Sequence, residues 1–234
     1  MMIPILSYHS INNQKCPMSL DVNDFEDQLI YLKKNNHCSV HFNEINNNKN
    51  KQFIMTFDDG YKDIIINCLP LLKKYNFKAI CYIVSNNIGK TNKWDFNKKS
   101  IIQKELMSKN DLHEWVDNGM LIGSHSHDHA DLTALSNKEI SYQVIESKKV
   151  LQDLFGFEIN SFSYPFGKHN LYVKNIVKNN YLNAVTTNRS RFNTNKHNLF
   201  SIPRIDMGKK QSNFMIYLKL RSIYEDIKFK KYDM

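Results

Sequence analysis

The stretch Phe53-Ile54-Met55-Thr56-Phe57-Asp58-Asp59-Gly60 joins a short apolar run to two adjacent carboxylates and a glycine. A run of this length that ends in turn residues is typical of a buried β-strand. Asp58 and Asp59 leave the strand in different directions, so the two carboxylates can take different roles, and Gly60 lets the chain turn sharply. The stretch therefore predicts a buried strand with acidic residues at its carboxyl end.

Other apolar runs of strand length lie on both sides of this stretch, at Ile3–Tyr8, Ala79–Val84, Leu121–Ser124, Ser161–Tyr164, Ala184–Thr187 and Ser201–Ile205. Segments of helical periodicity lie between them. This alternation predicts a parallel α/β architecture. Seven strands in all favour closure into a barrel over an open sheet, although periodicity does not decide between the two.

The helical segments carry recognisable start and stop signals. Residues 25–32 and 64–75 repeat apolar side chains at helical spacing, and Asp111 is expected to cap a short helix that ends near Gly119. Ser136 and Glu139 form a capping box that opens a long helix, and Gly156 ends it. Another helix is expected around residues 173–177.

Composition narrows the class of protein. The chain has 234 residues, 41% hydrophobic content and a formal charge of +9. We expect residues 1–234 to form one globular domain, since no linker or repeat divides them. The basic residues form no nucleic-acid motif, so we expect no nucleic-acid partner, whereas the apolar and basic segment 214–221 can contact an anionic membrane or pack as a last helix. The sequence has no transmembrane run and no leader pattern, so we expect a cytoplasmic protein.

The most distinctive polar segment is Ser124-His125-Ser126-His127-Asp128-His129, directly after the strand Leu121–Ser124. In parallel α/β folds the carboxyl ends of the strands meet at one edge, which brings this cluster near Asp58 and Asp59. Imidazoles and a carboxylate are the ligands of a catalytic zinc-type ion, and a second carboxylate beside the ion can deprotonate water. His125 can pair with His129 on a turn or with His127 on a strand face, and the sequence leaves both pairs open.

The segment Ser163-Tyr164-Pro165-Phe166-Gly167 follows a further strand end. A Pro-aromatic-Gly corner can aim the backbone N–H of Phe166 at the site as an oxyanion donor. A plain turn between strand and helix explains the same residues equally well.

With these motifs in place, the chain resembles the NodB-type polysaccharide deacetylases, carbohydrate esterase family four. Thr56–Gly60 matches the TFDDG motif of that family, and His125–His129 matches its H-[ST]-x-x-H motif. The resemblance spans about residues 1–210. It implies that Asp59, His125 and His129 bind the metal and that Asp58 is the general base. It also implies a distorted (β/α) barrel with about seven parallel strands.

The chain departs from the family pattern in two places. The third motif usually begins with arginine, whereas this chain has Ser163, and Arg204 is the candidate that would brace Asp58 instead. No late Leu-x-His segment supplies the acid histidine. The first strand instead ends in Tyr8-His9, as in a circularly permuted branch that includes poly-N-acetylglucosamine deacetylases, so the resemblance makes His9 the general acid.

The resemblance implies metal-dependent N-deacetylation of an N-acetylated sugar, glycan or glycan precursor. Because the sequence shows no leader pattern, we expect a lipid- or nucleotide-linked precursor at the inner membrane face, in surface-polysaccharide or lipopolysaccharide synthesis. Zn²⁺ is the expected ion, with Co²⁺, Ni²⁺ and Mn²⁺ as alternatives. Three other functions stay open. They are hydrolysis of another amide, such as deformylation, glycan binding without catalysis, and a phosphatase that would use Mg²⁺ on the Asp-Asp-Gly loop.

Overall fold

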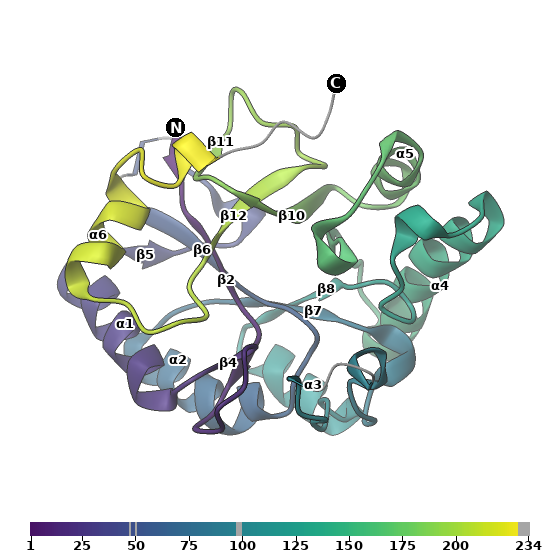
Figure 1. The fold of residues 1–234 in the computed structure, drawn as a ribbon, viewed down its shortest axis with the longest axis horizontal. Coiled ribbons are helices and arrows are strands. Elements are labelled where there is room, and N and C mark those ends of the chain that lie inside the picture. The colour runs from purple at the N-terminus through teal and green to yellow at the C-terminus, as the bar shows by residue number, and fades with distance from the viewer. Residues whose placement is uncertain (47, 50, 97–99, 229–234) are drawn as a thin grey trace.

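Strands and helices alternate along most of the chain, in the computed structural model that describes residues 1–46, 48–49, 51–96 and 100–228 (Figure 1). The strands are β1 (Met2–Ile3), β2 (Ile5–Tyr8), β3 (Ser10–Ile11), β4 (Ser19–Leu20), β5 (Cys38–Ser39), β6 (Gln52–Phe57), β7 (Ile80–Ile83), β8 (Leu121–Ser124), β9 (Ser161–Ser163), β10 (Asn183–Arg189), β11 (Phe192–Asn193) and β12 (Ile202–Asp206). The α-helices are α1 (Val22–Lys34), α2 (Leu69–Tyr75), α3 (Lys109–Asp117), α4 (Asn137–Phe155), α5 (Leu171–Asn180) and α6 (Asn213–Arg221).

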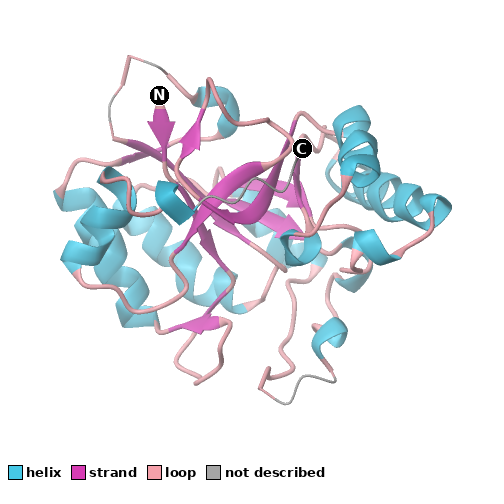
Figure 2. Cartoon of the chain, turned by 45° about the horizontal axis from the view of Figure 1, so that its top comes forward, coloured by secondary structure: helices cyan, strands magenta, loops and turns pink. Residues whose placement is uncertain are grey.

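The central sheet is a closed parallel barrel. Its strands follow the order β2-β12-β10-β9-β8-β7-β6, and the pairing of β2 with β6 closes the ring. Helices lie around the outside of the sheet (Figure 2). The expected α/β barrel with about seven parallel strands is confirmed, and the closure that periodicity left open is settled by the β2–β6 register, in which Tyr8 pairs with Phe57.

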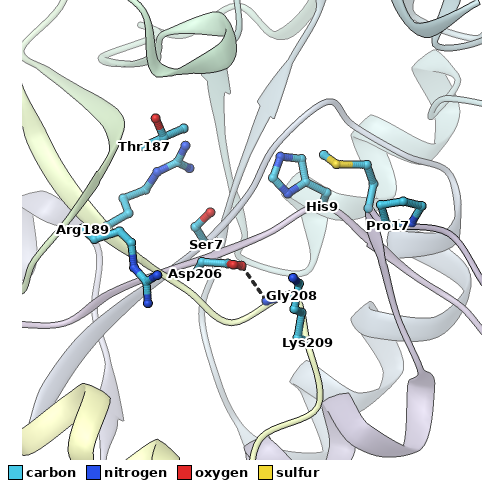
Figure 3. A pocket seen from close by; sticks show the side chains of 10 residues that line it. Ser7, His9, Pro17, Thr187, Arg189, Asp206, Gly208 and Lys209 are labelled. Atoms are coloured by element: carbon cyan, nitrogen blue, oxygen red, sulfur yellow. Dashed lines mark hydrogen bonds between the residues drawn. The ribbon is translucent and has the colours of Figure 1, made fainter. Parts of the chain in front are cut away.

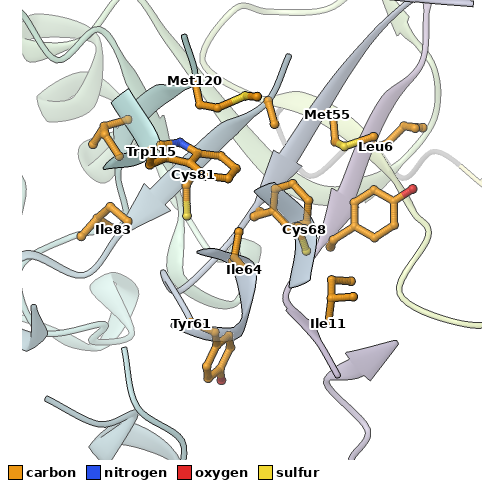
Figure 4. Packing of buried hydrophobic residues seen from close by; sticks show 14 of the residues in the cluster. Leu6, Ile11, Met55, Tyr61, Ile64, Cys68, Cys81, Ile83, Trp115 and Met120 are labelled. Carbon is orange, nitrogen blue, oxygen red and sulfur yellow. The ribbon is translucent and has the colours of Figure 1, made fainter. Parts of the chain in front are cut away.

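Two layers of apolar side chains hold the barrel together, because successive residues of a strand point to opposite faces. Ile5, Ile54, Ile80, Val185 and Ile202 belong to a cluster that fills the inside of the barrel. Their neighbours on the same strands face outward and pack against the helices, as Figure 4 shows for Leu6, Met55, Cys81 and Ile83.

This alternation also places polar residues inside the barrel. On β6 and just beyond it, Thr56 and Asp58 lie two and four residues after Ile54, and on β12 Arg204 lies two residues after Ile202. All three polar side chains are buried. The inside of the barrel is therefore apolar toward the amino ends of these strands and polar toward their carboxyl ends.

The structure corrects two sequence-based expectations on local elements. Ser108 caps α3, and Asp111 lies three residues later, where its carboxylate accepts the Ser108 backbone N–H and completes a capping box. Asp111 is thus part of the cap without being its first residue. The predicted strand Ile3–Tyr8 is divided at Pro4, which has no N–H to donate, so β1 pairs antiparallel with β11 and only β2 enters the barrel.

The other helix signals are confirmed. Ser136 and Glu139 form the capping box of α4, and Gly156 ends the helix in the left-handed conformation with φ 72°. Helix α6 packs through Ile216 and Leu220 and leaves Phe214 and Tyr217 exposed. Within the described residues, we find no helix with the length and hydropathy that a membrane span requires.

Candidate metal centre

Five predicted site residues meet at the carboxyl end of the barrel. Asp58 and Asp59 follow β6, His125 and His129 follow β8, and Phe166 lies in the turn after β9. Strands β6, β7, β8 and β9 follow one another in the sheet, so their carboxyl ends bring together segments that are far apart in the sequence. This edge is where parallel α/β barrels gather reactive side chains.

Asp59, His125 and His129 form a group that fits a divalent ion. Their ligand atoms lie within 4.8 Å of one another. Asp59 Oδ1 is 3.4 Å from His125 Nε2 and 3.3 Å from His129 Nε2. All three side chains are buried, and Asp59 Oδ1 has no hydrogen-bond partner among the described atoms. A buried carboxylate oxygen that faces two imidazoles without a hydrogen bond is the arrangement that a bound cation would complete.

The turn after β6 aims Asp59 away from Asp58. Asp59 has φ 71° and Gly60 has φ 76°, so the chain reverses within two residues. A Cβ on Gly60 would come within 2.8 Å of Ile83 Cδ1, and the Gly60 carbonyl accepts a hydrogen bond from Met107 N at 2.8 Å. The positive φ at position 60 therefore favours glycine, and the turn gives the two carboxylates separate surroundings.

His125 is oriented by a backbone carbonyl. Its Nδ1 lies 2.7 Å from the carbonyl oxygen of Ser163, and a carbonyl can only accept, so Nδ1 carries the proton. The lone pair of Nε2 then faces Asp59 and is free to bind an ion. A hydrogen bond of this kind on the second ring nitrogen is common for histidines that bind metals.

A tight turn selects His129 as the second imidazole. The Ser126 hydroxyl accepts the backbone N–H of His129 at 3.0 Å, which gives a physical reason for a serine or threonine at this place in the motif. His127 lies outside the group, since its Nδ1 is 2.9 Å from the Ser85 hydroxyl. Between the two pairs that the sequence left open, the structure brings together His125 and His129.

Backbone strain is concentrated at this site. Among the described residues, seven other than glycine have positive φ, and four of them are Asp59, Ser126, His129 and Phe166. Each such conformation costs about 1–2 kcal/mol. A protein retains this cost where the surrounding structure enforces it, which is the usual situation at a functional site.

Two aromatic rings enclose His129. The Trp94 ring stacks on it with centroids 4.5 Å apart and planes 24° apart, and the Phe166 ring meets it edge-on at 4.6 Å. Trp94 comes from the long segment between β7 and α3, which sequence reasoning did not connect with the site. The only available signal was a tryptophan placed in a polar, aperiodic segment.

Arg204 holds Asp58 inside the barrel. Its guanidinium donates to both carboxylate oxygens, at 2.8 Å and 2.6 Å, so the ion pair is bidentate. It also donates to the Thr186 carbonyl, the Thr56 hydroxyl and, at 3.3 Å, the Ser163 hydroxyl. Ser163 stands where the family motif usually has arginine, and Arg204 reaches Asp58 from β12 instead. Sequence reasoning named Arg204 but did not foresee these hydroxyl and carbonyl partners.

The environment keeps both carboxylates ionised. Burial alone would raise the pKa of Asp58, but the charge and hydrogen bonds of Arg204, with smaller contributions from His125 and His9, lower it below its ordinary value. Burial would likewise raise the pKa of Asp59, and the imidazoles of His125 and His129 outweigh it, so this pKa is held well below the usual range. Each carboxylate is therefore available as a base or a ligand.

His9 lies one residue beyond β2, next to Asp58. The register of β2 and β6 continues past the strands, since Asp58 N donates to the Tyr8 carbonyl at 3.0 Å. His9 lines a cavity of about 290 Å³ together with Ser7, Pro17, Met18, Thr187, Arg189, Arg204, Asp206, Gly208 and Lys209 (Figure 3). This cavity opens between the ends of β2, β10 and β12 and has room for part of a small substrate.

The turn that carries Phe166 packs tightly on β10. Gly167 has φ 70°, and a Cβ there would lie 2.0 Å from the Thr187 hydroxyl oxygen. Phe166 itself has φ 58° and lies beside His129. The Pro-aromatic-Gly corner is thus fixed against the barrel and places the Phe166 ring against His129.

Comparison with known proteins gives the same family as the motifs. A family model described as polysaccharide deacetylase matches residues 45–185. The protein YxkH of Bacillus subtilis is 28% identical over 193 residues, which cover 79% of this chain and 64% of that one. A poly-beta-1,6-N-acetyl-D-glucosamine N-deacetylase of Staphylococcus epidermidis is 27% identical over 197 residues, which cover 78% of this chain and 65% of the relative. The chain therefore spans slightly less than two thirds of the length of these relatives.

A solved structure extends the likeness to the fold. The Streptococcus pyogenes deacetylase PplD, determined in complex with acetate, superposes with a TM-score of 0.81 at 22% identity, over 94% of this chain and 99% of that one. At this identity the likeness concerns the fold alone. Because the family model covers more than half of the residues, the chain belongs to the polysaccharide deacetylase family.

Proposed function

We propose that the protein is a metal-dependent hydrolase that removes N-acetyl groups from an N-acetylated sugar or polysaccharide precursor. The observation that carries this proposal is the buried group of Asp59, His125 and His129 with the ionised Asp58 beside it. Membership of the family and the staphylococcal relative named for poly-N-acetylglucosamine deacetylation support the choice of substrate class.

Asp59, His125 and His129 would hold the ion, with Zn²⁺ as the first choice for this donor set and Co²⁺, Ni²⁺ or Mn²⁺ as alternatives. When bound, such an ion polarises a carbonyl and lowers the pKa of a water molecule. The ligand atoms of these three residues lie within 4.8 Å of one another, which supports their assignment as the metal ligands.

Asp58 would act as the general base. Its carboxylate is ionised and fixed by Arg204, so it can accept the proton of the attacking water without first losing one of its own. The role of Arg204 is then to keep the charge of Asp58 and to set the direction of its oxygens.

Two further groups would complete the reaction. The backbone N–H of Phe166 would donate to the oxygen that gains negative charge, since the Pro165–Gly167 turn lies beside His129. His9, on the cavity side of Asp58, would donate a proton to the leaving amine. The bond broken is the amide C–N bond, and the products are acetate and a free amino sugar.

We also propose a setting for this reaction. A cytoplasmic location at the inner membrane face would suit a lipid- or nucleotide-linked glycan precursor. The exposed Phe214 and Tyr217 of α6, next to Arg221, support a peripheral contact with anionic membrane. We propose that residues 1–234 act as one domain, since a single closed barrel contains both motifs.

The test is acetate release from short N-acetylglucosamine oligomers before and after removal of metal by a chelator. We expect acetate with the metal-loaded protein, loss of activity after chelation and recovery with Zn²⁺ or Co²⁺. Formate from an N-formyl sugar, with no acetate from any N-acetyl sugar, would replace the proposal with deformylation. Binding of the oligomers without hydrolysis by the metal-loaded protein would replace it with glycan binding.

A further inference from the structure

A second polar cavity lies at the amino end of the barrel, away from the metal-binding group. Its volume is about 210 Å³, which corresponds to several water molecules. It is lined by residues of β1, the start of β6, the segments after α1 and β10, and the end of α6, among them His37, Lys51, Arg191 and Arg221. None of them has a role in the proposed deacetylation.

The charge around this cavity is positive. Lys51 and Arg221 line it, and none of its lining residues, all of them described, is acidic. The Lys51 amine donates to the Asn35 carbonyl at 2.9 Å, which holds it in place without neutralising it. Arg191 also lines the cavity, but its charge is balanced by an ion pair with Asp226. Lys51 and Arg221 thus place two cationic side chains at the cavity, and none of its described lining residues carries a carboxylate side chain.

His37 is the buried polar group of this cavity. Its side chain is only 8% exposed, and neither Nδ1 nor Nε2 has a hydrogen-bond partner in the part of the chain that the structure describes. Burial, together with the charges of Lys51 and Arg221, lowers the pKa of His37 to about 4. The imidazole is therefore neutral at neutral pH and offers one N–H donor. A buried donor without a partner is unfavourable, which favours a ligand or water that accepts its hydrogen bond.

We propose that this cavity binds a phosphate-type oxyanion. Lys51 and Arg221 supply the charge, and the His37 N–H supplies a directional hydrogen bond. Guanidinium and ammonium groups are the usual partners of phosphate oxygens. The bound group is either a soluble phosphate compound or the headgroup of a phospholipid, since Ile223 and Ile227 are exposed just beyond Arg221.

The experiment uses the full chain and inorganic phosphate as the probe. We expect one saturable site by calorimetry, with movement of the His37 ring signals in nitrogen-detected NMR spectra. The variant Lys51→Gln/Arg221→Gln should bind phosphate at least tenfold more weakly, about 1.4 kcal/mol. Lys138→Gln/Lys149→Gln on exposed parts of α4 makes the same change in net charge and should bind like the wild type.

A second arm separates the two sources of phosphate. Vesicles of phosphatidic acid in phosphatidylcholine should retain the wild type and the α4 variant, but not the double variant, if a lipid headgroup is the ligand. Binding of soluble phosphate without retention assigns the site to a soluble compound. Should the double variant fail to fold, Arg221→Gln alone, at an exposed position, takes its place.

The proposal is overturned by any of three results. They are the absence of saturable binding in both arms, equal binding by the wild type and the double variant, and binding that leaves the His37 signals unmoved. None of these readouts depends on acetate release, so the anion site and the deacetylase proposal can fail separately.

Discussion

Replacing Arg204 with methionine tests the link between the barrel interior and the site. The change keeps an unbranched chain but removes the charge that faces Asp58, and both side chains are almost fully buried. Removal of one partner of a buried ion pair costs about 3–5 kcal/mol, because the remaining buried charge is no longer compensated. We therefore expect Arg204→Met to lower the free energy of unfolding by about that amount at pH 7.

The pH dependence of this loss follows from the direction of the pKa change. In the wild type the pKa of Asp58 is lowered in the folded protein. The ionised Asp58 therefore contributes fully to the free energy of unfolding above the ordinary pKa of an aspartate, and this contribution is lost as the pH falls through the lowered pKa of the folded protein. Without Arg204, burial raises the pKa of Asp58, and the carboxyl takes up a proton more readily. The difference in the free energy of unfolding between the wild type and Arg204→Met should be largest at neutral pH and should become smaller under acidic conditions.

The assay is urea denaturation of four proteins: wild type, Arg204→Met, Asp58→Asn and the double variant. Because the double variant leaves neither charge of the Asp58–Arg204 pair in the barrel, we expect it to regain more than 1 kcal/mol relative to Arg204→Met. Lys168→Met, which breaks a largely exposed pair with Asp131, is the matched control and should cost at most about 1 kcal/mol. A loss below 1 kcal/mol for Arg204→Met, or no recovery in the double variant, would refute the reasoning.

Three further predictions concern the turns, the buried histidine and the aromatic neighbour. Gly167→Ala should destabilise the protein by more than Gly119→Ala in thermal unfolding. Both glycines have positive φ, but only a Cβ at position 167 would overlap another residue, Thr187. Equal decreases in the melting temperature of the two variants would contradict this. The free energy of unfolding should fall as the pH drops from about 6.5 toward about 4, because His37 is neutral in the folded protein and takes up a proton more readily when unfolded. In His37→Asn this fall should be smaller by about 1–2 kcal/mol. An unchanged dependence of the unfolding free energy on pH in the variant would exclude His37 as its source. Trp94→Ala should weaken Zn²⁺ or Co²⁺ binding about tenfold in chelator competition, because the ring stacks on His129; wild-type affinity would show that the stacking does not position this ligand.

Local sequence signals predicted the elements of the fold well. The apolar run before Asp58 and the capping box at Ser136 each specify one conformation from neighbouring residues alone. Errors arose where two signals competed, as with Ser108 and Asp111, which share one capping box. Closure of the barrel was beyond local signals, since it depends on the pairing of β2 with β6, far apart in the sequence.

The site was predictable to the extent that it is carried by short motifs. The pairs Asp58-Asp59 and His125/His129 occur in two compact segments, whereas the choice of His129 over His127 depends on a turn that the Ser126 hydroxyl closes. The contact of Trp94 with His129 depends on how a long segment folds back, and no periodicity describes that. Side chains that meet through tertiary structure alone are the ones that sequence patterns miss.

The division of roles between the two adjacent carboxylates is the central claim, and one paired measurement tests it most directly. Metal content and acetate release are measured together for Asp58→Asn and Asp59→Asn. The account predicts that Asp58→Asn keeps its metal but loses at least about a hundredfold in turnover, as expected for a general base, whereas Asp59→Asn loses the metal. Wild-type turnover by Asp58→Asn, or full metal affinity in Asp59→Asn, would contradict it.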